Sequence, residues 1–250
     1  DLKGEEGTAV DISVMRGTEE IDLTVTRRKI EVPTVESRML TDTIGYIGIT
    51  EFDDVTDDQF LSALDELKEE GMQDLVIDLR NNGGGLVDTC VNMADLILPE
   101  GVVVSMKDKN GNVTEKKIDD EYYDVPMVVL VNGYSASASE ILAGAIRDYK
   151  AGTLVGTKTF GKGIVQSSLE FVDGSGMKVT TARYYTPSGE CIHGVGIEPD
   201  VEIELDEDAV TRYGINNLPH DHDAQLQKAI ELLGGTPVLA TATPDEAEAE

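Results

Sequence analysis

The chain has 250 residues, of which 20 are Lys or Arg and 49 are Asp or Glu, so its formal net charge is −29. This length is enough for one large domain or two small ones with a buried core, and a hydrophobic content of 40 % is typical of a globular protein. The acidic balance argues against a protein that binds nucleic acid by neutralising its phosphates, and it argues against docking on anionic lipid.

Two cysteines, Cys90 and Cys191, are too few for a disulfide framework or a four-thiolate zinc site. They form one bridge or none, and the sequence leaves both open. No apolar run reaches the roughly 18 to 20 residues that a membrane span needs. The chain opens at Asp1 without an initiator methionine or a signal peptide, which indicates a trimmed chain and leaves the compartment open.

The first 43 residues predict a hairpin followed by a connector. Polar and apolar residues alternate over 7–27, with a break at Arg16–Glu19, which is typical of two paired strands. A two-stranded hairpin is only marginally stable alone, so we expect it to pack on another element or to be the remnant of a domain. Residues 28–43, which include Pro33, predict the connector.

Downstream, short apolar strands alternate with amphipathic helices, a pattern that favours an α/β fold with much parallel pairing. The predicted strands are 44–49, 75–79, 102–106, 113–118, 125–131, 154–156, 165–171 and 177–185. The predicted helices are 56–71, 87–98, 137–149 and a last one around 226–233. Thr56 and Gln59 have the spacing of a capping box at the start of the first helix. The acidic segment 241–250 predicts a disordered tail.

A glycine-rich turn is the first segment that could carry chemistry. Between a predicted strand and a predicted helix, Asp78–Leu86 contains Gly83, Gly84 and Gly85. Glycines let a ligand approach backbone N–H groups, and a helix N-terminus favours negative charge. The spacing fits neither a phosphate loop nor a dinucleotide loop. A flexible strand-to-helix turn is the alternative interpretation.

A serine follows the next buried strand and precedes a helix. The small neighbours of Ser137 leave its hydroxyl accessible to a substrate, and the N–H of Ala138 would face a developing oxyanion. These features favour a nucleophile. Ser137 and Glu140 also have capping-box spacing, so a helix N-cap is the alternative interpretation.

A lysine in an uncharged stretch is the candidate base. Lys162 lies between two glycines, with no acid within several residues on either side. A buried lysine without a counter-charge can act as a general base. Gln166, four residues on, falls on the same side of the chain and could orient the amine without supplying charge. The alternative is a surface lysine on a glycine turn.

Histidine offers little as an alternative base. The chain contains His193, His220 and His222, and the first of these lies among glycines that predict a turn. The run His220–Asp223 predicts the polar cap of the last helix rather than a metal patch. A Ser-His-Asp triad has no supporting motif, and we expect no metal site.

Taken together, these segments resemble the C-terminal processing peptidases, also called tail-specific proteases. The resemblance extends from about residue 7 to 233, with matching motifs at 78–85, 135–145, 156 with 159–166, 185–189 and 194–200. It implies a serine endopeptidase that cuts proteins near their C-termini through a Ser-Lys dyad. Ser137 would be the nucleophile, Lys162 the base and Gln166 the residue that positions the lysine. Ala138 would supply one oxyanion N–H, and Gly85 rather than Gly84 the other.

The resemblance also implies an architecture and a setting. The fold would be α/β, with a crotonase-like core on a mixed or parallel sheet and strands of a truncated PDZ domain. Residues 1–30 would be the last strands of that incomplete domain, 31–240 the peptidase core and 241–250 the tail. Such enzymes need no cofactor and act on polypeptides with accessible C-terminal tails. They work outside the cytoplasm, in the bacterial cell envelope or as secreted proteins. A membrane anchor through an N-terminal segment and a homo-oligomer stay open.

Two other classes of function remain as alternatives. One is a tail-binding scaffold with a vestigial site, which a serine-directed probe would not label. The other is an acyl-CoA enzyme of the crotonase fold, which would use an oxyanion hole but not the Lys162 and Gln166 pair. The acidic surface either keeps the protein soluble or steers basic substrate tails toward it.

Overall fold

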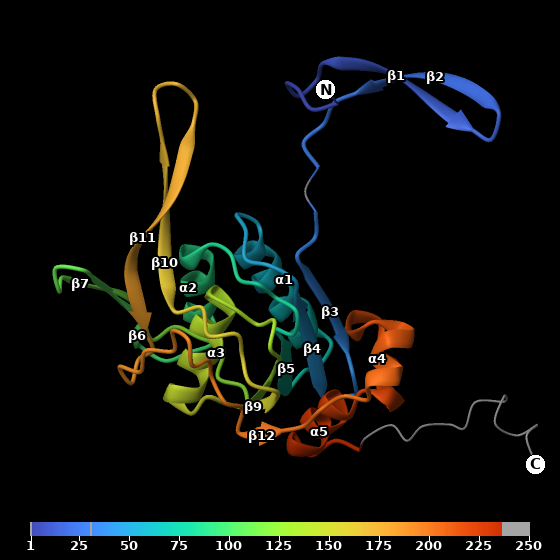
Figure 1. The fold of residues 1–250 in the computed structure, drawn as a ribbon. Helices are drawn as coiled ribbons and strands as arrows, with labels where there is room; N and C mark the ends of the chain where they lie inside the picture. Colours follow the sequence, from blue (N-terminus) through green and yellow to red (C-terminus); the bar gives the residue numbers. More distant parts are fainter. Residues whose placement is uncertain (1, 31, 237–250) are drawn as a thin grey trace, which may run out of the picture. The chain divides into compact units, whose positions relative to one another are not determined.

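A computed structural model describes residues 2–30 and 32–236, so the predicted tail at 241–250 lies outside the described residues. The chain divides into two compact units, Asp1–Pro33 and Thr34–Glu250. The first unit contains the predicted hairpin, in which β1 (Ala9–Arg16) pairs antiparallel with β2 (Glu19–Thr26) along its whole length (Figure 1). Its apolar cross-strand pairs share one face, as strand alternation requires. They are Val10 with Val25, Ile12 with Leu23, and Val14 with Ile21.

The second unit is built on a six-stranded sheet in the order β12-β9-β8-β5-β4-β3 (Figure 1). The parallel strands are β4 (Ile44–Ile49), β5 (Asp74–Asp78), β8 (Met127–Val131), β9 (Gly152–Gly156) and β12 (Val201–Glu202). At the other edge, β3 (Val35–Met39) pairs antiparallel with β4. The prediction of an α/β fold on a mixed, largely parallel sheet is confirmed.

Helices cover both faces of this sheet, because parallel strands bury side chains on both sides. Ile77 and Val129 belong to the larger hydrophobic core, with the helices α1 (Thr56–Glu69), α2 (Val87–Asp95) and α3 (Ala138–Tyr149). Their strand neighbours Val76 and Val128 point the other way, into the core formed with α5 (Ala224–Leu232). A short helix, α4 (Glu207–Tyr213), and the 3₁₀ turns Ile215–Asn217 and His220–His222 precede α5.

A second, antiparallel sheet has the order β10-β11-β6-β7. Its strands are β6 (Gly101–Asp108), β7 (Val113–Ile118), β10 (Ile164–Glu170) and β11 (Gly176–Tyr185). The β10–β11 hairpin projects from the body of its unit (Figure 1). The pairing of β10 with β11 shifts register between Val165 and Gln166, and such a bulge re-aims the side chains beside it.

The structure corrects several details of the expected elements. The predicted connector contains β3. The predicted capping box at Thr56 is absent, because Val55 is the N-cap of α1 and the side chain of Gln59 bonds elsewhere. The Gln59 side-chain oxygen accepts the N–H groups of Thr34 and Val35, at 2.9 and 3.2 Å, and so fastens α1 to the start of β3. Helix α2 ends at Asp95, three residues earlier than expected, and the short elements β12 and α4 were not predicted.

A buried ionic network joins the last helix to the central sheet. The guanidinium of Arg80, two residues after the end of β5, donates to Asp78 at 2.6 Å and to Asp223 at 2.8 Å. Asp223 is also the N-cap of α5 and accepts the N–H of Leu226. The expected polar cap at His220–Asp223 is therefore present. Among the described residues, no group of His, Cys, Asp and Glu could hold a metal ion.

Two further observations concern the cysteines and the helices. Cys90 is buried, Cys191 is half-buried, and both are free thiols. In the part of the chain that the structure describes, no helix combines the length and the apolar character needed to cross a bilayer.

Candidate active site

The carboxyl ends of three adjacent parallel strands position the candidate residues. The glycine loop follows β5, the Ser137 turn follows β8, and the Lys162 segment follows β9. Because β8 lies between β5 and β9, the three connections emerge side by side at one edge of the sheet. Ligand sites of open α/β sheets form at this edge.

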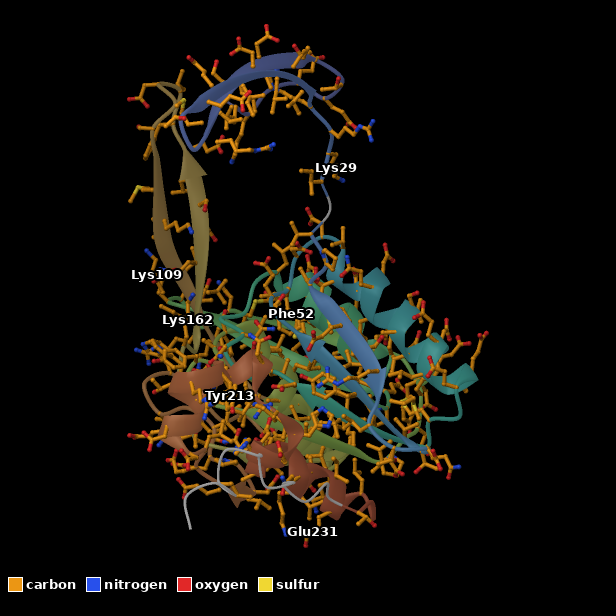
Figure 2. The ribbon with its side chains drawn as sticks, turned by 90° about the vertical axis from the view of Figure 1, so that its right-hand side faces the viewer. Lys29, Phe52, Lys109, Lys162, Tyr213 and Glu231 are labelled. Atoms are coloured by element: carbon orange, nitrogen blue, oxygen red, sulfur yellow. The ribbon has the colours of Figure 1, made fainter. Side chains whose placement is uncertain are left out.

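These connections, together with β10 and β11, line a half-open cavity of about 320 Å³. Its lining includes Ser137, Lys162, Gln166 and Gly85, together with Tyr184 from β11. Figure 2 shows Lys162 at the foot of the β10–β11 hairpin, where the hairpin joins the body of its unit. The structure thus brings the predicted nucleophile, base, positioning residue and one predicted oxyanion glycine into one cavity, and their chemical roles stay predictions.

The backbone of Ser137 is strained. This residue has φ 58° and ψ −113°. A positive φ is uncommon for any residue but glycine, and such conformations typically cost about 1–3 kcal/mol. A sharp strand-to-helix turn of this kind exposes the hydroxyl of a nucleophilic serine in α/β-hydrolases. Ser137 is also the N-cap of α3, and its N–H donates to the Glu140 side chain as in the expected capping box, so the two interpretations of this residue are compatible.

A single buried carboxylate ties the Ser137 turn to the Lys162 segment. Glu140 is 0 % exposed. Its Oε2 accepts the N–H of Ser137 at 3.0 Å and the N–H of Lys162 at 2.8 Å. Its Oε1 accepts the hydroxyl of Thr159 at 2.6 Å and the N–H of Gly161 at 2.7 Å. The carboxylate therefore fixes the backbones of the candidate nucleophile and base relative to each other.

Tyr184, near the end of β11, also connects the Ser137 turn to the Lys162 segment. Its hydroxyl contacts the carbonyl oxygen of Ser137 at 3.1 Å and also the carbonyl oxygen of Lys162. Burial, reinforced by the nearby charge of Glu140, raises the pKa of Tyr184 above its ordinary value. The phenol thus stays protonated at neutral pH and remains a donor to these carbonyls.

The glycine loop can approach the nucleophile turn only because it has no side chains. A Cβ on Gly84 would lie 2.9 Å from the nitrogen of Ala138, and a Cβ on Gly85 would lie 2.0 Å from the oxygen of Phe52. Phe52, labelled in Figure 2, holds the loop through hydrogen bonds from its N–H to the oxygen of Gly84 and from the N–H of Leu86 to its own oxygen. Both predicted oxyanion glycines therefore lie in a loop packed closely against neighbouring backbone.

Some residues of this site were missed in the sequence. Glu140 was interpreted only as a capping partner, although a lone acid beside so many small and apolar residues is a signal of a buried carboxylate. Tyr184 gave no local signal, because its partners lie 47 and 22 residues away along the chain. The alternative base His193 is exposed and does not line the cavity.

The sequence of the chain is similar to a known family of peptidases. Residues 43–203 match the model of peptidase family S41. A protein of Staphylococcus haemolyticus (strain JCSC1435) named "Probable CtpA-like serine protease" is 41 % identical over 206 residues, which cover 81 % of this chain and 41 % of that protein. The protein of the same name in Staphylococcus aureus (strain COL) is 41 % identical over 208 residues, or 82 % of this chain and 42 % of its own length.

Solved structures are also similar, and one of them is a processing protease. The photosystem II D1 C-terminal processing protease is 34 % identical with a TM-score of 0.64, and the match covers 86 % of this chain and 62 % of that protein. The chain thus spans about two fifths of the length of the curated relatives that it matches.

Proposed function

The chain belongs to peptidase family S41, and from this premise we propose that it is a serine endopeptidase that cuts polypeptides near their C-termini through a dyad of Ser137 and Lys162. The observation that carries the proposal is the shared cavity, in which a strained serine at a helix start meets a lysine and a glycine loop. The C-terminal preference is supported by the resemblance of the motifs and by the similarity to the D1 processing protease.

The proposed reaction needs only residues of this cavity. Neutral Lys162 takes the hydroxyl proton of Ser137 as the serine oxygen attacks a peptide carbonyl and forms an acyl-enzyme. Lys162 then gives the proton to the departing amine nitrogen, and water hydrolyses the ester. Gln166, which shares the cavity, would orient the amine without adding charge.

The backbone distinguishes between the two candidate glycine donors. The N–H of Gly84 already donates to the side-chain oxygen of Asn82 at 2.8 Å. Gly85 forms a parallel β-bridge with Phe52, in which the oxygen of Gly84 and the N–H of Leu86 make the two hydrogen bonds to Phe52. The N–H of Gly85 itself therefore points away from Phe52. We therefore assign the oxyanion hole to the N–H groups of Gly85 and Ala138. Losing one such donor typically costs about 3 kcal/mol of transition-state stabilisation.

The family premise extends to the architecture and the setting of the enzyme. We propose a crotonase-like core and a place of action outside the cytoplasm. We also propose that β1 and β2 are the last strands of a PDZ domain, because their shared apolar face includes half-exposed Val10, Ile12 and Ile21.

A test of the PDZ assignment compares this chain with one to whose N-terminus the remaining strands of a PDZ domain are fused. The amides of β1 and β2 are expected to exchange with solvent at least tenfold more slowly in the longer chain, because a completed domain protects its strands from opening. Helix α3 serves as the internal control. Equal exchange of the hairpin in both chains would contradict the assignment.

The proposed reaction predicts covalent capture of one serine. Diisopropyl fluorophosphate is expected to give a single adduct on Ser137, mapped by peptide mass spectrometry, and to stop the cleavage of casein. EDTA should leave cleavage unchanged, because the proposed reaction uses no metal. An adduct elsewhere, or cleavage that survives full modification, would contradict the role of Ser137. A chain that, even with its N-terminal extension, neither reacts nor cuts casein would overturn the peptidase proposal.

A further inference from the structure

The cavity differs in charge from the protein that contains it. The chain carries 49 acids against 20 Lys and Arg. Among the described residues that line the cavity, Lys162 and Lys178 are the basic side chains, and no Asp or Glu takes part. Because the proposed reaction assigns Lys162 to proton transfer with Ser137, Lys178 is the lysine that remains to attract an anion into this cavity.

On this basis, which rests on the proposed peptidase function, we propose that Lys178 forms a subsite for a carboxylate of the substrate. The carboxylate would lie on the segment that leaves with the amine, about two to three residues beyond the cleaved bond. The ligand chemistry is a carboxylate held by an ammonium group, and either the chain terminus or an acidic side chain of the leaving segment supplies it.

Strand register sets the place of this subsite. Lys178 on β11 pairs with Ser168 on β10, and Gln166 pairs with Thr180. Cross-strand partners share a face, and residues two apart on a strand do so as well. Gln166, Ser168 and Lys178 accordingly all line the cavity. Ser168 lies about 6.6 Å beyond Gln166, at about 3.3 Å per residue, so an extended peptide along β10 reaches Lys178 about two residues after it passes Gln166.

The direction of the peptide follows from the proton transfer. Lys162 protonates the departing nitrogen, so the leaving segment must begin on the Lys162 side of Ser137. Strand β10 starts at Ile164, two residues after Lys162, and continues outward along the hairpin. The side of the cavity formed by Ser168 of β10 and Lys178 of β11 therefore lies beside the part of the substrate that leaves with the amine. It does not lie beside the part that stays attached to Ser137 as the ester.

Lys178 is also available for a ligand. Several lysines elsewhere form ion pairs with neighbouring acids: Lys116, Lys117, Lys158 and Lys228. Lys178 is exposed, and it forms no ion pair with any residue that the structure describes. The nearest acid on the same strand pair, Glu170, shares a face with Lys178 but lies diagonally from it, opposite Gly176, and forms no ion pair with it. The ammonium group can thus meet an incoming carboxylate without first breaking a salt bridge.

The test uses a casein fragment that the chain itself cleaves, resynthesised so that it ends three residues after the cleaved bond. One version carries a free terminal carboxylate, a second carries a terminal amide, and a third carries the amide with Asp as the final residue. The parent is expected to cut the free acid about three- to tenfold better in kcat/KM than the plain amide, the range of one partly solvated charge pair. Raising the salt concentration should shrink this ratio.

The variants assign the effect to one side chain. Lys178→Gln should bring the acid-to-amide ratio close to one, whereas Lys178→Arg should retain it. Lys109→Gln, which removes the same charge from the turn between β6 and β7 outside the cavity, should keep the parent ratio (Figure 2). Melting temperatures verify that each variant is folded.

The outcomes separate this proposal from the peptidase proposal. A parent that cuts acid and amide equally well, or a Lys178→Gln variant that keeps the preference, overturns the carboxylate subsite and leaves the peptidase function intact. A parent that cuts none of the peptides and no casein overturns both. Equal acceleration by the terminal Asp of the third peptide identifies the source as any carboxylate at that distance, whereas acceleration by the free terminus alone identifies the chain end.

Discussion

The Ser137→Ala and Lys162→Ala variants, and the double variant, are each expected to lose about 10⁴- to 10⁶-fold in kcat. A nucleophile and its base act as a unit, so removing either one costs almost as much activity as removing both. The cavity brings both side chains to one place, and Glu140 and Tyr184 fix the backbones that carry them. What remains in the variants should be the modest contribution of the oxyanion donors and of substrate binding. The measurement is the rate of cleavage of casein and of one defined peptide.

Lys158→Ala is the matched control for Lys162→Ala. Lys158 belongs to the same connection after β9, but it forms a surface ion pair with Glu198 at 2.7 Å and does not line the cavity. Its replacement should change kcat less than twofold, because Lys158 does not contact the cavity. The fold should also stay intact, since an exposed ion pair contributes only about 0–1 kcal/mol to stability. A Lys162→Ala enzyme within tenfold of the parent would exclude the lysine as the base. Strict additivity of the two losses in the double variant would show that the residues act separately.

The Glu140→Gln variant is expected to be less stable by about 2–6 kcal/mol and to lose about 10²-fold in kcat. The buried carboxylate accepts two hydrogen bonds on each oxygen. A carboxamide nitrogen cannot accept them, so two buried donors lose their partner at about 1–3 kcal/mol each. Either the Ser137 and Lys162 amides or the Thr159 and Gly161 donors are then released, and a shift of about 1 Å in a catalytic group can cost about 10²-fold in rate.

Chemical denaturation measures the loss of stability, and steady-state kinetics well below the melting temperature measures the loss of activity. A positioning role predicts that kcat falls while KM changes little, and that diisopropyl fluorophosphate labels Ser137 more slowly. Glu198→Gln, at an exposed carboxylate, is the control and should change neither quantity appreciably. A folded Glu140→Gln enzyme with the parent kcat would show that the carboxylate only stabilises the fold.

Much of the fold could be read from local patterns. The hairpin in the first unit, the buried strands at 44–49 and 75–79 and the helices after the Gly83–Gly85 and Ser137 turns occur where periodicity and turn chemistry predict them. These signals are local, because alternation along a strand and the 3.6-residue period of a helix depend on neighbours in the sequence. Strand β3 was missed because its pairing partner β4 and its tie to Gln59 come from outside the segment.

The sequence by itself determined the chemical types of the candidate site and the segments that carry them: a glycine loop, a serine at a helix start, and a lysine with a glutamine four residues on. Only the tertiary structure decided that these segments meet. They follow β5, β8 and β9, and it is the order of these strands in the sheet that places their carboxyl ends side by side. The same holds for Glu140, which accepts hydrogen bonds from the distant segment 159–162, and for Tyr184, whose partners are 47 and 22 residues away along the chain. The physical reason is that local backbone preferences fix which residues turn or extend, whereas long-range strand pairing and burial fix which of them share a cavity.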